Sequence, residues 1–172
     1  MTTIETSRRN QMVGAAFLAI AMAAVVGAAL ALEYIGGYMP CELCLKERIP
    51  YYVGVPLMVL AFIAALLKAP QPLVRGLLAL GVLAMLIGAG LSIYHAGVEW
   101  HWWPGPSSCT GTGGAMSSDA TNLLANLNTV KPPSCDVAAL RVLGLSLAGW
   151  NVVATLVLAA IAAPFAFRRT GK

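Results

Sequence analysis

Charged residues are scarce in this sequence. Of its 172 residues only 10% are Asp, Glu, Lys or Arg, while 59% are hydrophobic, and a soluble domain usually carries roughly 25% charged residues. No internal repeat and no separate soluble domain can be recognised. This shortage of charge excludes an ordinary water-soluble domain and indicates a chain that folds in a lipid bilayer.

Four long stretches contain no charged residue at all. Each reaches or nearly reaches the ~20 residues that a helix needs to cross about 30 Å of hydrocarbon. The stretches are Met12 to Leu32, Ile49 to Leu67, Gly76 to Tyr94 and Val142 to Phe167. We predict an all-α membrane protein, a bundle of four transmembrane helices with a long outer loop between the third and fourth.

The first stretch has an alternative interpretation as a secretory signal. Arg8 and Arg9 precede it, and Ala29-Leu30-Ala31 resembles a small-residue cleavage site. Its uncharged run is longer than the about 7 to 15 apolar residues of a signal peptide. We therefore expect a retained span and a single membrane domain over residues 1–172. The expected spans lie at about 12–35, 49–67, 73–94 and 144–167, and the outer loops at about 36–48 and 95–141.

Basic residues are concentrated on one side of the predicted bundle. Four spans place both termini and the turn from Lys68 to Pro72 together. That side holds most of the eleven basic residues, namely Arg8, Arg9, Lys68, Arg75, Arg168, Arg169 and Lys172. The positive-inside rule then predicts that both termini are cytoplasmic. Because this anchoring accounts for the net charge of +4, we expect no nucleic-acid partner.

All four cysteines fall in or beside the two outer loops. Cys41 and Cys44 belong to the first loop and Cys109 and Cys135 to the second, with none in a predicted span or on the cytoplasmic side. In a bacterium the outer side is the oxidising periplasm, where disulfides persist. The cysteines are thus positioned for disulfide chemistry.

Cys41-Glu42-Leu43-Cys44 is a C-x-x-C element close to the expected start of the second helix. A metal site is one interpretation. Zinc sites, however, usually have four ligands that lie close together, and the other two cysteines, Cys109 and Cys135, lie far along the chain. A redox pair is favoured, because a helix N-terminus stabilises a thiolate. We predict a redox pair and no metal.

Arg48 follows Cys44 by four residues, so on a helix its guanidinium would lie over the same face as the second sulfur. It would favour a thiolate there, and a charge at the membrane edge is expensive enough to suggest a role. The alternative is a flanking arginine that reaches the lipid head groups. Pro50 leaves open whether Cys44 and Arg48 lie on the second helix or in a turn before it.

Cys109 and Cys135 share the long outer loop with a Gly/Ser-rich stretch from Gly105 to Ser118. A structural disulfide is one interpretation. The other interpretation is thiol–disulfide exchange with the first pair. The Gly/Ser-rich setting favours this interpretation, because exchange requires a loop that can approach the first pair and an accessible sulfur atom. His95 ends the third helix at the expected depth of Arg48, where it could hydrogen-bond a bound ligand, carry a proton or serve only as an anchor.

The whole pattern resembles the DsbB family, four-helix membrane proteins that oxidise a thioredoxin-fold partner and reduce quinone. The resemblance covers nearly the whole chain. It is carried by Pro40-Cys41-x-x-Cys44-x-x-Glu47-Arg48 after the first span, by the second cysteine pair, and by Leu143-Gly144-Leu145 followed by Trp150 before the last span.

The resemblance implies a quinone-dependent protein-disulfide oxidase of the bacterial inner membrane. By position, Cys109 would be attacked by a DsbA-like periplasmic disulfide donor, Cys135 would pass the electrons on, and Cys41 and Cys44 would receive them. Cys44 would face the quinone, either ubiquinone or menaquinone, with Arg48 and His95 at the quinone site. A partner near −120 mV requires a high-potential acceptor, and a quinone meets that requirement.

Two alternative functions remain open from the sequence. A vitamin K epoxide reductase-like enzyme also has four helices and two cysteine pairs, but there the loop cysteines precede the C-x-x-C, whereas here Cys41 and Cys44 come first. A membrane protein with structural disulfides or a bound metal would show stable cysteine pairing or tight zinc binding without thiol exchange.

Overall fold

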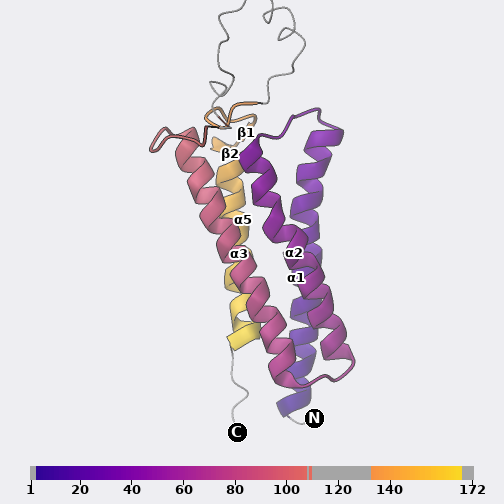
Figure 1. Ribbon diagram of the computed structural model, residues 1–172. Coiled ribbons are helices and arrows are strands. Elements are labelled where there is room, and N and C mark those ends of the chain that lie inside the picture. The colour runs from indigo at the N-terminus through magenta and orange to yellow at the C-terminus, as the bar shows by residue number, and fades with distance from the viewer. Residues whose placement is uncertain (1–2, 108, 110–132, 168–172) are drawn as a thin grey trace, which may run out of the picture.

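The computed structural model describes residues 3–107, 109 and 133–167. Within these residues four long helices run side by side (Figure 1): α1 (Thr3–Tyr34), α2 (Glu42–Leu66), α3 (Gln71–Glu99) and α5 (Leu147–Phe167). All four are long and apolar enough to cross a membrane. The predicted all-α, four-helix membrane fold is confirmed. The start of α1, the end of α5 and the α2–α3 turn lie at one end of the bundle, and the cysteine pairs lie at the other.

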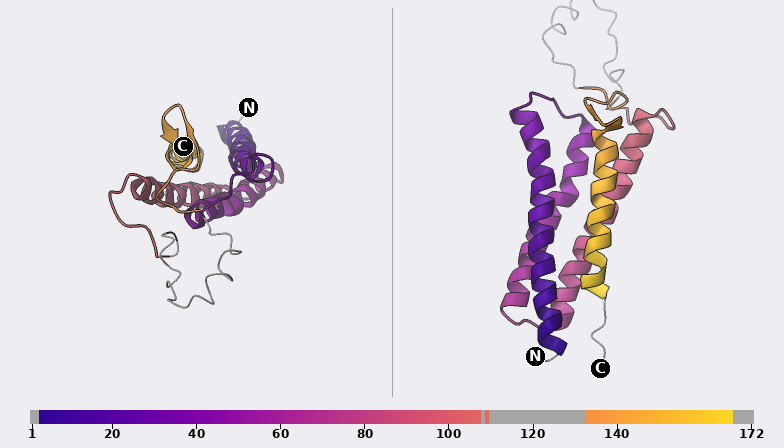
Figure 2. Two further views of the ribbon diagram at one scale, coloured as in Figure 1. Left: turned by 90° about the horizontal axis from the view of Figure 1, so that it is seen from above. Right: turned by 180° about the vertical axis from the view of Figure 1, so that it is seen from behind.

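Helix α3 lies at the centre of the packing. It contacts α2 on one side and α5 on the other, while α1 packs mainly against α2, as the view from above shows (Figure 2). Helices α1 and α5 contact each other much less than these neighbouring pairs do. The seam between α1 and α5 is therefore the least closed side of the bundle.

The helices pack around a core of methionine, leucine and alanine side chains. Met22, Met58 and Met85 are fully buried there. Two glycines make room for these flexible side chains, because a Cβ atom at Gly54 would crowd Met22 and one at Gly81 would overlap Met58. The outward positions carry exposed aliphatic residues, as expected of helices whose solvent is lipid.

Helices α2 and α3 extend beyond the charge-free runs. Helix α2 begins at Glu42 rather than near residue 49, and α3 ends at Glu99 rather than near residue 94. Both extensions carry polar side chains that turn into the bundle, where they find partners. Pro50 lies inside α2. Cys44 and Arg48 are consequently on the helix, which decides the alternative that Pro50 left open.

A two-stranded hairpin precedes α5, formed by β1 (Arg141–Val142) and β2 (Leu145–Ser146) in antiparallel register. The turn residues Leu143 and Gly144 both have positive φ angles, of 53° and 84°. Two consecutive positive φ angles are the signature of the tight type I′ turn, which matches the twist of antiparallel strands. The Leu143-Gly144-Leu145 motif is thus the turn of this hairpin.

Side chains join the hairpin to the first turn of α5. The hydroxyl of Ser146 accepts a hydrogen bond from the backbone N–H of Gly149 at 3.1 Å, which caps the helix. The indole N–H of Trp150 donates to the carbonyl of Val142 at 2.9 Å. These contacts explain why Trp150 follows the turn motif at this spacing.

Aromatic residues cover the cysteine end of α3. Trp103 stacks on Tyr94 with ring centroids 6.1 Å apart, and its indole N–H donates to the Tyr94 carbonyl at 2.8 Å. Such side chains are typical of the membrane interface, where an apolar ring meets a polar edge. The ring of Trp103 also lies directly over Gly97, where only a hydrogen atom fits.

Replacing Gly97 with alanine is expected to displace Trp103 from Tyr94. The added Cβ would overlap the indole ring, and overpacking of this kind costs about 1–3 kcal/mol. Thermal unfolding in detergent and the emission wavelength of tryptophan would report the change. Gly90→Ala on the same helix is the matched control, because a Cβ there meets nothing within 4 Å. Equal melting temperatures for the two variants would contradict the expectation.

Candidate redox site

The two cysteine pairs meet at one end of the bundle. Cys109 and Cys135 are joined by a disulfide, whereas Cys41 and Cys44 carry free thiols whose sulfur atoms lie 2.7 Å apart. Cys41, Cys109 and Cys135 are buried in a single cluster, against which Cys44 packs. The topology therefore brings the pairs together although they are distant in sequence, as disulfide exchange requires.

Cys41 caps the N-terminus of α2. Its sulfur accepts a hydrogen bond from the backbone N–H of Cys44 at 3.2 Å. The side-chain hydrogen bond from Cys44, with a further contribution from His95, lowers the pKa of Cys41 to about 4 despite its burial. A capping position at a helix N-terminus favours a thiolate, so Cys41 has the electrostatic setting of a reactive cysteine.

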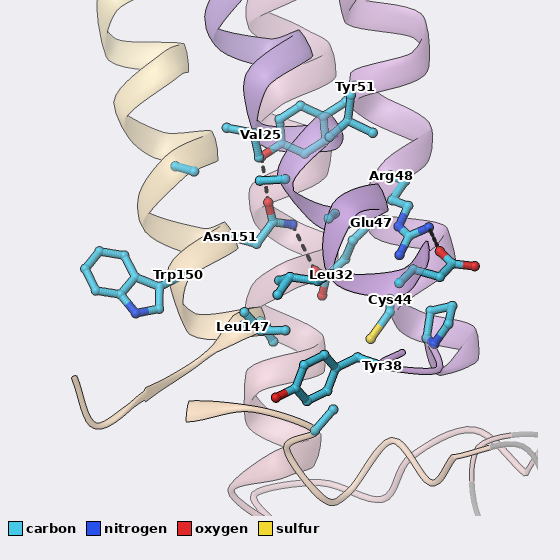
Figure 3. Close-up of a pocket in the computed structure, with 18 of the residues that line it drawn as sticks. Val25, Leu32, Tyr38, Cys44, Glu47, Arg48, Tyr51, Leu147, Trp150 and Asn151 are labelled. Carbon is cyan, nitrogen blue, oxygen red and sulfur yellow. Dashed lines mark hydrogen bonds and ion pairs between the residues drawn. The ribbon is translucent and has the colours of Figure 1, made fainter. Parts of the chain in front are cut away.

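A largely apolar cavity of about 350 Å³ opens beside the second cysteine (Figure 3). Residues of α1, α2 and α5 line it. Cys44, Arg48 and Tyr38 contribute to its wall near the cysteine end. Its other lining residues on the three helices are mostly aliphatic and include Val25, Leu32, Leu147 and Ala154. A cavity of this size and polarity suits a small aromatic or quinoid ring.

A second cavity of about 250 Å³ lies on the other side of the C-x-x-C pair. Cys41, His95 and Glu99 line this smaller cavity and do not line the larger one. Cys44 lines both. The second sulfur of the pair is thus the one that faces the larger cavity, while the first faces the smaller cavity, where His95 and Glu99 also lie.

Arg48 lies at the wall of the larger cavity and is 9% exposed. Its Nη1 group donates to Glu33 Oε2 at the end of α1 in a close ion pair. This partner holds the guanidinium at the cavity instead of at the lipid head groups. The arrangement favours a functional role for Arg48 over the snorkelling alternative.

A chain of hydrogen bonds crosses the bundle from the smaller cavity to the larger one. His95 Nε2 lies 3.6 Å from the sulfur of Cys41, and His95 Nδ1 lies 2.7 Å from Glu47 Oε1. Glu47 Oε2 accepts from the Asn151 amide at 2.9 Å, and the hydroxyl of Tyr51 donates to Asn151 Oδ1 at 2.6 Å. Glu47, Asn151 and Tyr51 all line the larger cavity.

The structure separates the two residues expected at the same site. Arg48 lines the larger cavity, but His95 lies behind the cysteine pair, beside Cys41. Glu33, Asn151 and Glu99 were not expected from the sequence. A signal existed for the two acids, because a carboxylate at a membrane edge is costly unless it is paired. Asn151 carries no charge, and only the fold reveals its neighbours.

Comparison with known proteins agrees with this arrangement. The profile of the family described as "Disulfide bond formation protein DsbB" matches residues 11–165, a range that covers most of each of the four long helices and all four cysteines. The chain belongs to the DsbB family. The match favours this family over the vitamin K epoxide reductase-like alternative, and the order of the cysteine pairs agrees with it.

A curated relative supports the DsbB assignment over a shorter region. "Disulfide bond formation protein B" from Cupriavidus necator is 33% identical over 81 residues. The aligned region covers 46% of this chain and 47% of that relative, so it spans about half the length of each. No solved structure matches the chain.

Proposed function

We propose that this chain is a quinone-dependent protein-disulfide oxidase that regenerates a periplasmic thioredoxin-fold disulfide donor. One observation carries the proposal: Cys44 lies at the wall of an apolar cavity with Arg48, and its partner Cys41 belongs to the same cluster as the Cys109–Cys135 disulfide. A ring bound in the cavity would lie next to the second sulfur of a pair that can exchange with the other disulfide.

The electrons would pass through the two pairs in turn. A thiolate of the reduced donor attacks the Cys109–Cys135 disulfide, and a second exchange leaves the donor oxidised and this pair reduced. The reduced pair then opens the Cys41–Cys44 disulfide and becomes a disulfide again. Finally Cys41 and Cys44 close their own disulfide by giving two electrons to the quinone, which takes up two protons.

His95 and Glu47 are suited to the proton part of this last step. His95 contacts Cys41, and Glu47, its hydrogen-bond partner, lines the larger cavity. A proton leaving the first sulfur can thus reach the cavity through one imidazole and one carboxylate. This role corresponds to proton transfer by His95 and not to direct contact with the quinone ring.

The location follows from the same chemistry and the charge distribution. A disulfide donor works in the oxidising periplasm, and the basic residues at the opposite end of the bundle favour a cytoplasmic position for both termini. We therefore propose a bacterial inner-membrane protein whose cysteine pairs face the periplasm. Ubiquinone or menaquinone would reach the cavity from the lipid through the seam between α1 and α5.

The proposal is tested by quinone-dependent oxidation of a reduced, DsbA-like periplasmic protein. Purified full-length chain is mixed with the reduced protein and a water-soluble ubiquinone or menaquinone analogue, and quinone absorbance is followed. Catalytic turnover with one of the two quinones is expected. Absence of turnover with both, while both disulfides form in the purified chain, would refute the assignment.

Replacing Arg48 with histidine is expected to raise the KM for quinone by about tenfold. A charge-assisted hydrogen bond contributes about 1.5–3 kcal/mol, and tenfold corresponds to the lower end of that range. The KM for the protein donor should stay within about twofold, because the donor acts at the other cysteine pair. Lys46→Gln is the control, since Lys46 lies on the same helix, pairs with Glu42 and does not line the cavity. Equal changes in both KM values would count against a quinone role.

A further inference from the structure

The smaller cavity gathers more ligand atoms than a redox pair needs. The sulfur atoms of Cys41 and Cys44 and a ring nitrogen of His95 all lie within 4.8 Å of one another. Glu99 lines the same cavity, and its Oε1 lies 3.9 Å from His95 Nε2. Two thiolates, an imidazole and a carboxylate are the ligand types that zinc takes in proteins.

His95 is held in the orientation of a metal ligand. Its Nδ1 lies 2.7 Å from Glu47 Oε1, which fixes the proton on Nδ1 when Glu47 is a carboxylate. Nε2 is then the nitrogen that faces Cys41 and Glu99. A carboxylate that accepts the distal N–H of a ligating histidine is the usual second contact of a zinc site, since it sets the ring orientation and raises its basicity.

Glu99 supplies an independent observation. The residue is only 7% exposed, and its Oε2 atom has no hydrogen-bond partner among the described residues. A buried carboxylate oxygen without a partner is costly. A cation bound between Glu99 and the sulfur atoms would remove that cost, whereas thiol exchange gives Glu99 no role.

We propose that the reduced Cys41–Cys44 pair, together with His95 and Glu99, binds one zinc ion. Zinc-to-sulfur and zinc-to-nitrogen bonds of roughly 2.0–2.3 Å in a tetrahedron require neighbouring ligand atoms roughly 3.3–3.8 Å apart. The contact between Cys41 and His95, at 3.6 Å, already has this separation. The sulfur atoms need only move apart by about 1 Å, which small side-chain rotations provide.

Binding would depend on the oxidation state of the pair. A disulfide has no thiolate to offer, so only the dithiol form can hold the ion. Zinc bound to both sulfur atoms would prevent them from forming a disulfide and giving their electrons to an acceptor. It would therefore inhibit turnover until the ion is removed. Cysteine spacing alone argues against such a site, because the second pair is distant in sequence. The missing two ligands come from α3 instead.

Zinc titration of the reduced chain tests this inference without quinone or protein donor, so its outcome is independent of the proposed oxidase activity. The full chain carries Cys109→Ser and Cys135→Ser, which leaves only the Cys41–Cys44 pair, and a chromophoric chelator competes for the metal. One zinc ion per reduced chain is expected, with affinity at least about 100-fold lower after oxidation. Glu99→Gln should weaken binding by about 10-fold or more.

Glu42→Gln is the matched control, because Glu42 adjoins Cys41 but pairs with Lys46 and does not line the cavity. Its zinc affinity should equal that of the parent chain. Tight binding by the oxidised form would overturn the proposal. So would equal affinity in the Glu99→Gln and parent chains, which would mean adventitious binding by the C-x-x-C pair alone. If the double serine variant fails to fold, Co²⁺ titration of the native chain decides the question, since a tetrahedral thiolate spectrum must appear on reduction and be lost in Cys44→Ser.

Discussion

Replacing Cys44 with serine is expected to lower steady-state quinone reduction by about 10³-fold or more, since the variant lacks the redox-active group itself. Cys44 lines the apolar cavity, whereas Cys41 lines only the smaller one. A serine hydroxyl at this position can neither form a disulfide nor give electrons to a ring. Quinone absorbance in the presence of excess reduced donor protein provides the measurement.

The same variant should still oxidise its donor once. Its Cys109–Cys135 disulfide is intact, so one equivalent of donor can be oxidised even though the electrons have no further acceptor. Cys109→Ser is the matched comparison and should lose both the single round and the steady state. Continued turnover in Cys44→Ser would contradict the assigned order of the two pairs.

Replacing Glu47 with leucine is expected to destabilise the bundle by about 2 kcal/mol. The leucine fills a similar volume, but His95 Nδ1 loses its acceptor and the Asn151 amide keeps only Ser92. A buried polar group left without a partner costs about 1–3 kcal/mol. Hydrogen bonds between membrane helices contribute about 0.6 kcal/mol on average and up to about 1.7 kcal/mol each, so the loss of both Glu47 hydrogen bonds is consistent with a total of about 2 kcal/mol. Unfolding by sodium dodecyl sulfate in mixed micelles, followed by circular dichroism, measures the change.

Glu47→Gln provides the graded comparison. Glu47 uses Oε1 for His95 and Oε2 for Asn151, and in glutamine one of these two atoms becomes an NH₂ group, which cannot accept a hydrogen bond. About half of the stability lost in Glu47→Leu should therefore be recovered. Lys46→Leu is the control for removing a charge from the same turn, since Lys46 is half exposed and its pair with Glu42 contributes only about 0.3–0.5 kcal/mol. If the Glu47→Leu variant were as stable as the parent protein, these hydrogen bonds would make no contribution to the stability of the bundle.

Hydropathy was sufficient to find the four helices but not their ends. Charge-free runs measure how much chain lies in hydrocarbon, and they stop at the first ionisable residue. Arg48 ends one such run and His95 another, yet both lie within continuous helices. They do so because their side chains meet partners on neighbouring helices, which no single stretch of sequence reveals.

The candidate site was predictable to a similar degree. The cysteines and Arg48 could be identified from local spacing, since a C-x-x-C element at a helix start carries its own physical argument. The pairing of Arg48 with Glu33, and of Glu47 with Asn151, depends on how α1 and α5 pack beside α2. His95 and Glu99 are four residues apart and would share a helix face, so their proximity could be predicted from local spacing as well.

The burial of the outer disulfide affects which thiols can use it. Cys109 and Cys135 are only 4% and 1% exposed, and exchange requires a thiolate to approach along the sulfur–sulfur axis. A small thiol in solution cannot reach the buried disulfide along this direction. A folded protein that binds at this end of the bundle can supply the energy to uncover the bond. Under the proposed function, selectivity would then come from docking, and small free thiols nearby would not be oxidised.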